Sequence, residues 1–141
     1  MTTVSAEREF VSSVGLFITG AALEPHEVSA LLGLMPDSCW RKGDPKPVGE
    51  TRYEAGGWKK RLPPRDCGDP FLQELQQWVE LLQPKASMLR RLQENGLHVV
   101  LECFVTINGA ALVEIDCALQ RRLAALSVPI TMAIWAATNV D

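Results

Sequence analysis

The sequence predicts an α+β fold, with a single mixed or antiparallel sheet and helices packed on one face. Segments with strand-like alternation and segments with helical apolar spacing follow one another without the strict alternation of a doubly wound α/β fold. The chain has 141 residues, 47% of them apolar. That is enough for one domain that folds without disulfides or metal. We expect a single domain over 1–141, with its core within about 14–137.

The first half opens with a strand and a helix. Residues 14–20 are mostly apolar and end at Gly20, which predicts a buried strand. Pro25 suits the first position of a helix. Apolar residues follow it at helical spacing until Gly33 and Pro36, so a short amphipathic helix is expected.

The segment 37–68 has a different composition. It holds four of the nine prolines and five of the ten glycines. Thr51–Glu54 and Gly57–Leu62 are expected to form two short strands with a bend between them. We interpret the segment as an exposed basic ribbon or loop insertion, outside the core.

A helix is predicted to begin at Asp69-Pro70, an N-cap residue followed by proline. Its apolar residues form one stripe: Phe71, Leu75, Trp78 and Leu82. Because the residue before a proline avoids helical geometry, Pro84 predicts a break near Gln83. A second helical piece is expected over 85–94, capped by Asn95-Gly96.

The last third alternates strand, helix and strand. Residues 97–107 have apolar side chains at every second position, which predicts a strand. A helix is expected near 115–126 and a final strand over 129–137. Gly109-Ala-Ala-Leu repeats the Gly20-Ala-Ala-Leu that follows the first strand. Two similar strand–helix–strand halves favour a ferredoxin-like arrangement.

Several patterns bear on compartment. The first ten residues are polar and do not resemble a signal peptide, so we expect none, and no apolar run is long enough to span a bilayer. The cysteines form no C-x-x-C pair, as is typical of reduced cytosolic thiols. We expect a cytoplasmic protein in which Cys103 and Cys117 are core residues. Cys39 and Cys67 flank the basic segment and are the cysteines expected to be exposed.

The motifs of several common enzyme classes are absent. There is no phosphate-binding loop, dinucleotide fingerprint or nucleophile elbow. The two histidines, His26 and His98, fall in different elements and have no ligand-like spacing with cysteines. We therefore expect no metal and no cofactor, and we favour a protein that is not an enzyme.

The positive charge is concentrated in one segment. Residues 41–65 contain eight basic and three acidic residues, a net charge of +5, while the whole chain carries −3. The basic residues are Arg41, Lys42, Lys46, Arg52, Lys59, Lys60, Arg61 and Arg65. Such a segment attracts anions, whether a small anion or an acidic protein surface. A solvated ribbon that docks on the chain's own acidic remainder is the alternative.

One block carries a family resemblance. The pattern Trp40-x-Lys42-Gly43-Asp44, with Leu16-Phe-Ile-Thr-Gly20 before it and Trp58 after it, resembles the bacterial domain-of-unknown-function family 4279. The resemblance covers about 14–137 and implies a small bacterial cytosolic protein, without implying an activity. The end of the last strand, Ile134-Trp-Ala136, departs from the acidic or tyrosine-ended strand expected there.

The Trp-x-Lys-Gly-Asp block has two interpretations. Structurally, Gly43 allows a tight turn, Asp44 bonds to backbone amides two residues on, and Trp40 anchors the loop on the core. Functionally, Lys42 and Asp44 form a site walled by Trp40 and Trp58. The candidate ligand- or partner-binding residues are Trp40, Lys42, Asp44, Trp58, Lys59 and Lys60.

Three function classes remain open. The favoured one is a non-catalytic interaction module that binds a protein partner, of the antitoxin or immunity type. The alternative is a small-ligand binder or enzyme with a pocket lined by Trp40, Lys42, Asp44 and Trp58. Single-stranded nucleic-acid binding through 41–65 is less favoured, because the chain is acidic overall.

Overall fold

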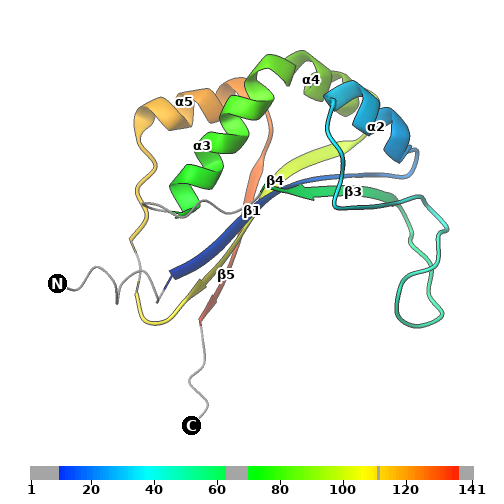
Figure 1. The fold of residues 1–141 in the computed structure, drawn as a ribbon, viewed down its shortest axis with the longest axis horizontal. Helices are drawn as coiled ribbons and strands as arrows, with labels where there is room; N and C mark the ends of the chain where they lie inside the picture. The colour runs from blue at the N-terminus through cyan, green and yellow to red at the C-terminus, as the bar shows by residue number, and fades with distance from the viewer. Residues whose placement is uncertain (1–9, 63–69, 111, 137–141) are drawn as a thin grey trace, which may run out of the picture.

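The computed structural model describes residues 10–62, 70–110 and 112–136. Its elements in chain order are β1 (Phe10–Gly20), α2 (Pro25–Leu32), β2 (Ser38–Trp40), β3 (Gly56–Arg61), α3 (Pro70–Leu82), the 3-10 turn η1 (Gln83–Lys85), α4 (Ala86–Glu94), β4 (His98–Ile107), α5 (Cys117–Leu126) and β5 (Ile130–Ala136). The strands form one sheet in the order β2-β3-β1-β4-β5. The helices lie together on one face of it (Figure 1). The predicted α+β class with a single mixed sheet is confirmed.

The two predicted halves differ in how their strands pair. Every described neighbouring pair is antiparallel except β4 and β5, which are parallel. In the first half, β3 lies between β1 and β2, so that strand–helix–strand unit is split. In the second half, β4 pairs directly with β5, and α5 makes the crossover between them. The second split unit is instead formed by β3 and β4, which flank β1 and are connected through α3 and α4. The strands β1 to β4 thus have the order of two split strand–helix–strand units, and β5 is an added strand beside β4.

The core lies between the sheet and the helices. The predicted stripe of α3 is fully buried, and α4 adds Leu89 and Leu92. From the sheet, Val14, Leu16 and Ile18 of β1 point toward the helices. The β4 residues buried beside them are Val99, Leu101, Cys103 and Val105. The alternation predicted for both strands is thus confirmed on this face.

The segment after α2 departs from its prediction. Trp58 is fully buried, and its indole Nε1 donates a hydrogen bond to Ser29 Oγ of α2 at 3.0 Å. β3 pairs on both sides, so this part of the segment belongs to the core. A strand at Thr51–Glu54 was expected, but there is only a single bridge, between Pro45 and Arg52. Composition is a poor guide here because glycines in β3 accommodate close neighbours, as shown below.

Several smaller expectations can be compared with the structure. Gly33 ends α2 with a φ of 67°, and the break at Pro84 is the turn η1 between α3 and α4. Cys103 is buried and Cys39 exposed, as predicted, but Cys117 at the start of α5 is exposed rather than in the core. Cys67 and Asp69 lie outside the described residues. No described helix is long and apolar enough to cross a membrane.

Candidate binding site on the open face of the sheet

The face of the sheet turned away from the helices is called the open face here. Because side chains alternate along a strand, the neighbours of buried residues point to this face. Phe17 lies between the buried Leu16 and Ile18, and in β3 it pairs with Lys59. Trp40 pairs with Gly57, whose neighbour Trp58 faces the helices. No described helix covers these open-face positions (Figure 1).

Aromatic rings gather on the open face in two groups. Trp40 stacks on Tyr53, with 4.5 Å between ring centroids, and its centroid lies 6.3 Å from that of Phe17. Farther along the sheet, Phe104 of β4 stacks with Trp135 of β5 at 5.8 Å. These rings are exposed or half-buried, so they present apolar surface to solvent.

Cationic side chains lie over these rings. The ammonium of Lys59 is 4.5 Å from the centroid of Phe17 and 5.7 Å from that of Trp40. The guanidinium of Arg61 is 5.5 Å from the centroid of Phe104. Each cation is attracted by the negative face of its ring, which holds it over the sheet. The open face therefore presents positive charge and aromatic surface together.

Two hollows adjoin these side chains. The larger, about 660 Å³, is lined by Ser38, Cys39, Trp40, Asp44, Pro45, Pro47, Tyr53 and Lys59. The smaller, about 180 Å³, is lined by Gly15, Leu16, Asp37, Ser38, Lys59, Lys60, Arg61, Glu102 and Phe104. They share Ser38 and Lys59. Lys59 therefore lines both hollows.

The loop between β2 and β3 forms one wall of the larger hollow. It extends beyond the strands and away from the helices (Figure 1). Backbone hydrogen bonds hold it as a narrow hairpin: the N–H of Gly43 donates to the carbonyl of Tyr53, and the N–H of Tyr53 to that of Asp44. Proline and glycine in this loop therefore accompany an ordered ribbon rather than an unstructured one.

Trp40 holds this hairpin against the sheet. A Cβ at Gly57 would overlap the indole ring of Trp40, so only glycine leaves room for the ring. The indole Nε1 also donates to the carbonyl of Ala55 at 3.0 Å. Trp40 anchors the loop as predicted, but on the open face rather than on the core.

The turn of the Trp-x-Lys-Gly-Asp block is held by its own side chain. Gly43 has a φ of 89°, a conformation that favours glycine. Asp44 Oδ2 accepts a hydrogen bond from the backbone N–H of Arg41 at 2.8 Å. The predicted bond ran to amides two residues on, and the observed bond runs three residues back. The structural interpretation of Gly43 and Asp44 is therefore supported, with that change.

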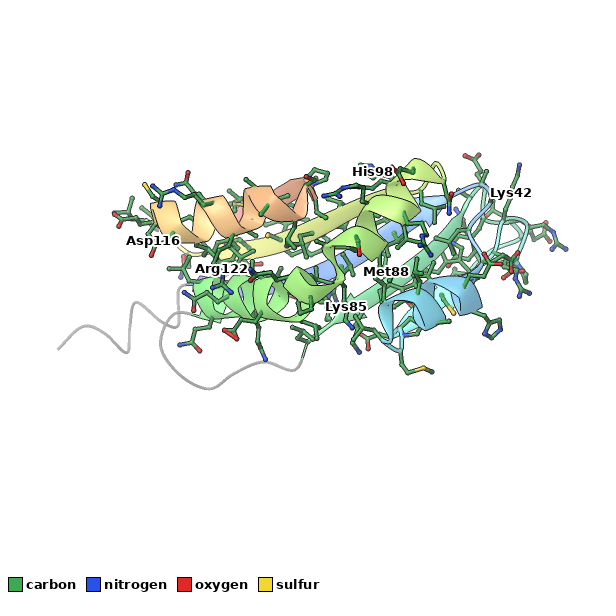
Figure 2. All side chains as sticks on the ribbon, turned by 90° about the horizontal axis from the view of Figure 1, so that it is seen from above. Lys42, Lys85, Met88, His98, Asp116 and Arg122 are labelled. Carbon is green, nitrogen blue, oxygen red and sulfur yellow. The ribbon has the colours of Figure 1, made fainter. Side chains whose placement is uncertain are left out.

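The six candidate residues do not form one site. Trp40, Asp44 and Lys59 line the larger hollow. Trp58 is buried on the other side of the sheet, so the expected four-residue pocket does not occur in the described structure. Figure 2 shows Lys42 at the hairpin end of the molecule, far from Asp116 of α5.

The remaining basic residues of the segment have mostly structural contacts. Lys60 donates to the carbonyl of Met35 at 2.9 Å. Arg41 forms an ion pair with Glu24 at 2.9 Å, and Arg52 donates to the carbonyl of Gly43. Of these contacts, only the Arg41–Glu24 ion pair joins the segment to an acidic residue elsewhere in the chain, as the alternative of a docked ribbon predicts. Arg65 lies outside the described residues.

Sequence reasoning missed three open-face residues, Phe17, Phe104 and Trp135, and named Arg61 only as one cation of the basic segment. The alternating pattern of β1 and β4 could have identified two of them, because Phe17 and Phe104 alternate with buried residues and so lie on the other face of the sheet. Which strands are neighbours could not be read from that alternation. The described residues include no cluster of three or more His, Cys, Asp or Glu side chains suited to a metal, and His26 and His98 are exposed.

Comparison with models of known protein families shows which family the chain belongs to. A family model described as "Domain of unknown function (DUF4279)" matches residues 9–137, which is most of the sequence. The chain belongs to the DUF4279 family. The resemblance seen in the sequence is thereby confirmed at the level of the family. No curated protein and no solved structure gives a significant match to this DUF4279 protein.

Proposed function

We propose that this DUF4279 protein is a non-catalytic binding module whose open face binds an acidic surface of a protein partner. The observation that carries the proposal is the placing of Lys59 and Arg61 over exposed or half-buried aromatic rings. Aromatic and arginine side chains dominate the energetics of protein interfaces. The aromatic and cationic side chains of the open face are spread over all five strands, which suits a large interface with another protein.

A protein fits this surface better than a single-stranded nucleic acid. Bases stack on free ring faces. Here Tyr53 stacks on Trp40, and Lys59 already lies over Phe17. The nucleic-acid alternative is kept as an outcome of the test.

A small ligand is the second candidate function. The larger hollow, of about 660 Å³, lies in the size range of ligand pockets and places the Lys59 ammonium beside the ring of Trp40. A small carboxylate or phosphate bearing an apolar group would suit it. Asp44 Oδ2 accepts the Arg41 amide hydrogen and so holds the turn of the hairpin, which is a structural role for this carboxylate. Ligand binding is therefore favoured over catalysis at this hollow.

The test compares two charge reversals on opposite faces. The double variant Lys59→Glu/Arg61→Glu changes the open face. Arg90→Glu/Arg121→Glu is the matched control, with the same change in charge at exposed positions of α4 and α5. Proteins captured from native lysate by the wild type are identified, purified and titrated calorimetrically against each variant. We expect the open-face variant to weaken the complex at least about tenfold and the control to leave it unchanged.

Other outcomes contradict the proposal. Equal affinity of the two variants for the partner would place the interface elsewhere. Tight binding of labelled oligodeoxythymidine that falls steeply between about 50 and 200 mM salt would indicate nucleic acid instead. A bound small molecule in the native mass spectrum, absent after Lys59→Glu, would favour the ligand function. If the captured partner is an enzyme that the module inhibits, the immunity interpretation gains support.

A further inference from the structure

β5 is an edge strand without the features that protect an edge. Among the described residues it pairs with β4 only. Its sequence, ITMAIWA, has no charged residue and no proline. Four of its large apolar side chains, Ile130, Met132, Ile134 and Trp135, are between 37% and 57% exposed. An edge of this kind presents backbone hydrogen-bonding groups and apolar surface to another strand.

The opposite edge of the sheet is protected. β2 has only three residues, and the hairpin loop that follows it carries Pro45, Pro47 and several charged side chains. Short strands, prolines and charges are the usual means of preventing edge pairing. The contrast between the two edges indicates that β5 is suited to pairing and β2 is not.

We propose that β5 pairs with β5 of a second copy of this chain, antiparallel, in a two-fold symmetric dimer. A two-fold axis requires a surface that is complementary to itself. β5 meets this requirement, because an uncharged strand places no like charges opposite each other. An acidic partner would gain no ion pair at this strand, which separates this surface from the open face.

The side-chain pattern of β5 also fits self-pairing. When two copies of one strand pair antiparallel, the numbers of the two residues in every facing pair add up to the same value. If that value is even, the two residues of each pair come from the same face of the strand, so both sheets keep their helices on the same side. When the two-fold axis passes Met132, the residues Ile130, Met132 and Ile134 of one copy meet the same three residues of the other, on the face that bears the helices. Those exposed side chains would become buried.

The dimer would also extend the open face. Trp135 stacks on Phe104 at that side of the sheet. Pairing of β5 with its copy brings the two Trp135 side chains onto one continuous open face of ten strands. The inference does not depend on the function proposed above, since it concerns self-association alone.

Sedimentation equilibrium of the purified chain between about 1 and 100 μM tests the proposal. We expect a dimer that Ile134→Lys weakens at least about tenfold, because the charge would be buried opposite apolar side chains. Ile134 is exposed in the single chain, so the variant retains its fold. Val48→Lys, at an 85% exposed position of the hairpin loop, is the matched control and should dimerise like the wild type. A wild type that stays monomeric, or a dimer unaffected by Ile134→Lys, overturns the proposal.

A cysteine scan tests the geometry. Single cysteines are placed in turn at positions 130–136, in a background with Cys39, Cys67 and Cys117 changed to serine. Antiparallel pairing brings only the position on the two-fold axis next to its own copy, within reach of a disulfide. We expect mild oxidation to cross-link one position far more than the others. A uniform yield across the strand would overturn the antiparallel arrangement.

Discussion

The carboxylate of Glu74 on α3 accepts a hydrogen bond from the backbone N–H of Val14 on β1, with 2.7 Å between Oε2 and N. One turn along α3, the indole Nε1 of Trp78 donates to the carbonyl oxygen of Val14 at 3.1 Å. Val14 lies just beyond Gly15, the last β1 residue that pairs with β3. Buried backbone N–H and carbonyl groups need hydrogen-bond partners. Two side chains of α3 supply these partners to Val14, where β3 no longer pairs with β1.

The first prediction concerns the charge of Glu74. Burial raises the pKa of this carboxyl above 4.5, and the Val14 hydrogen bond and the charge of Arg61 only partly oppose it. The folded protein therefore binds this proton more tightly than the unfolded chain does. The free energy of unfolding falls as the pH rises from about 4.5 through the folded-state pKa.

Glu74→Gln removes this pH dependence while retaining an oxygen acceptor for Val14. We expect the difference in the free energy of unfolding, variant minus wild type, to be larger at pH 7 than at pH 4, because only the wild type loses stability as the pH rises. Urea unfolding of both proteins at several pH values measures the difference. Parallel pH profiles of the two proteins would contradict the prediction.

The second prediction concerns Trp78. Trp78→Phe keeps most of the buried ring and removes the hydrogen bond to the Val14 carbonyl. We expect a loss of about 1–3 kcal/mol in the free energy of unfolding, the usual cost of a buried unpaired polar group. Trp135→Phe on the exposed end of β5 is the control, measured by the same denaturant titration. Equal losses for the two variants would show that the hydrogen bond is unimportant.

The third prediction concerns Gly57. In Gly57→Ala the new methyl group would displace the Trp40 ring, with loss of its stacking on Tyr53. We expect a destabilisation of roughly 1–3 kcal/mol, as for other overpacked sites, and a change in the near-ultraviolet circular dichroism. The same substitution in a Trp40→Ala background should cost almost nothing. A full cost in that background would mean that the glycine serves another purpose.

The fourth prediction concerns thiol reactivity. Burial raises the pKa of the Cys103 thiol to about 12, and the charge of Glu74 adds to this. The reactive thiolate is therefore scarce at neutral pH. We expect iodoacetamide to modify Cys39 and Cys117 in the native protein and Cys103 only after unfolding. Peptide mapping by mass spectrometry reads each site, and native modification of Cys103 would disprove its burial.

The local structure was largely predictable because each element carries its own signal. Pro25 and Gly33 delimit α2, and the stripe of α3 has the spacing of a buried helix face. These signals depend on residues close together in the chain. Pro84 likewise marks the turn between α3 and α4 through its effect on the preceding residue.

The candidate site was only partly predictable because it depends on strand order. Trp40 and Lys59 were singled out for their place in a basic segment, and both lie on the open face. Trp58 was grouped with them, although it points to the helices, since side chains alternate along β3. Arg61 joins Phe104 across β1, and this contact arises only once β3 and β4 flank the same strand.

The position of β1 at the centre of the sheet bears on how the chain is made. β1 is the first described strand, yet it pairs with β3 and with β4, which ends at Ile107. At about 5–20 residues per second, the 87 residues from Gly20 to Ile107 take roughly 4–17 s to synthesise. β3 is complete once Arg61 has been added, but throughout that interval the alternating apolar residues of β1 lack their other final neighbour, β4. Until β4 has been synthesised, β1 of the nascent chain can therefore pair with incorrect strands. The complete sheet can assemble only late in translation.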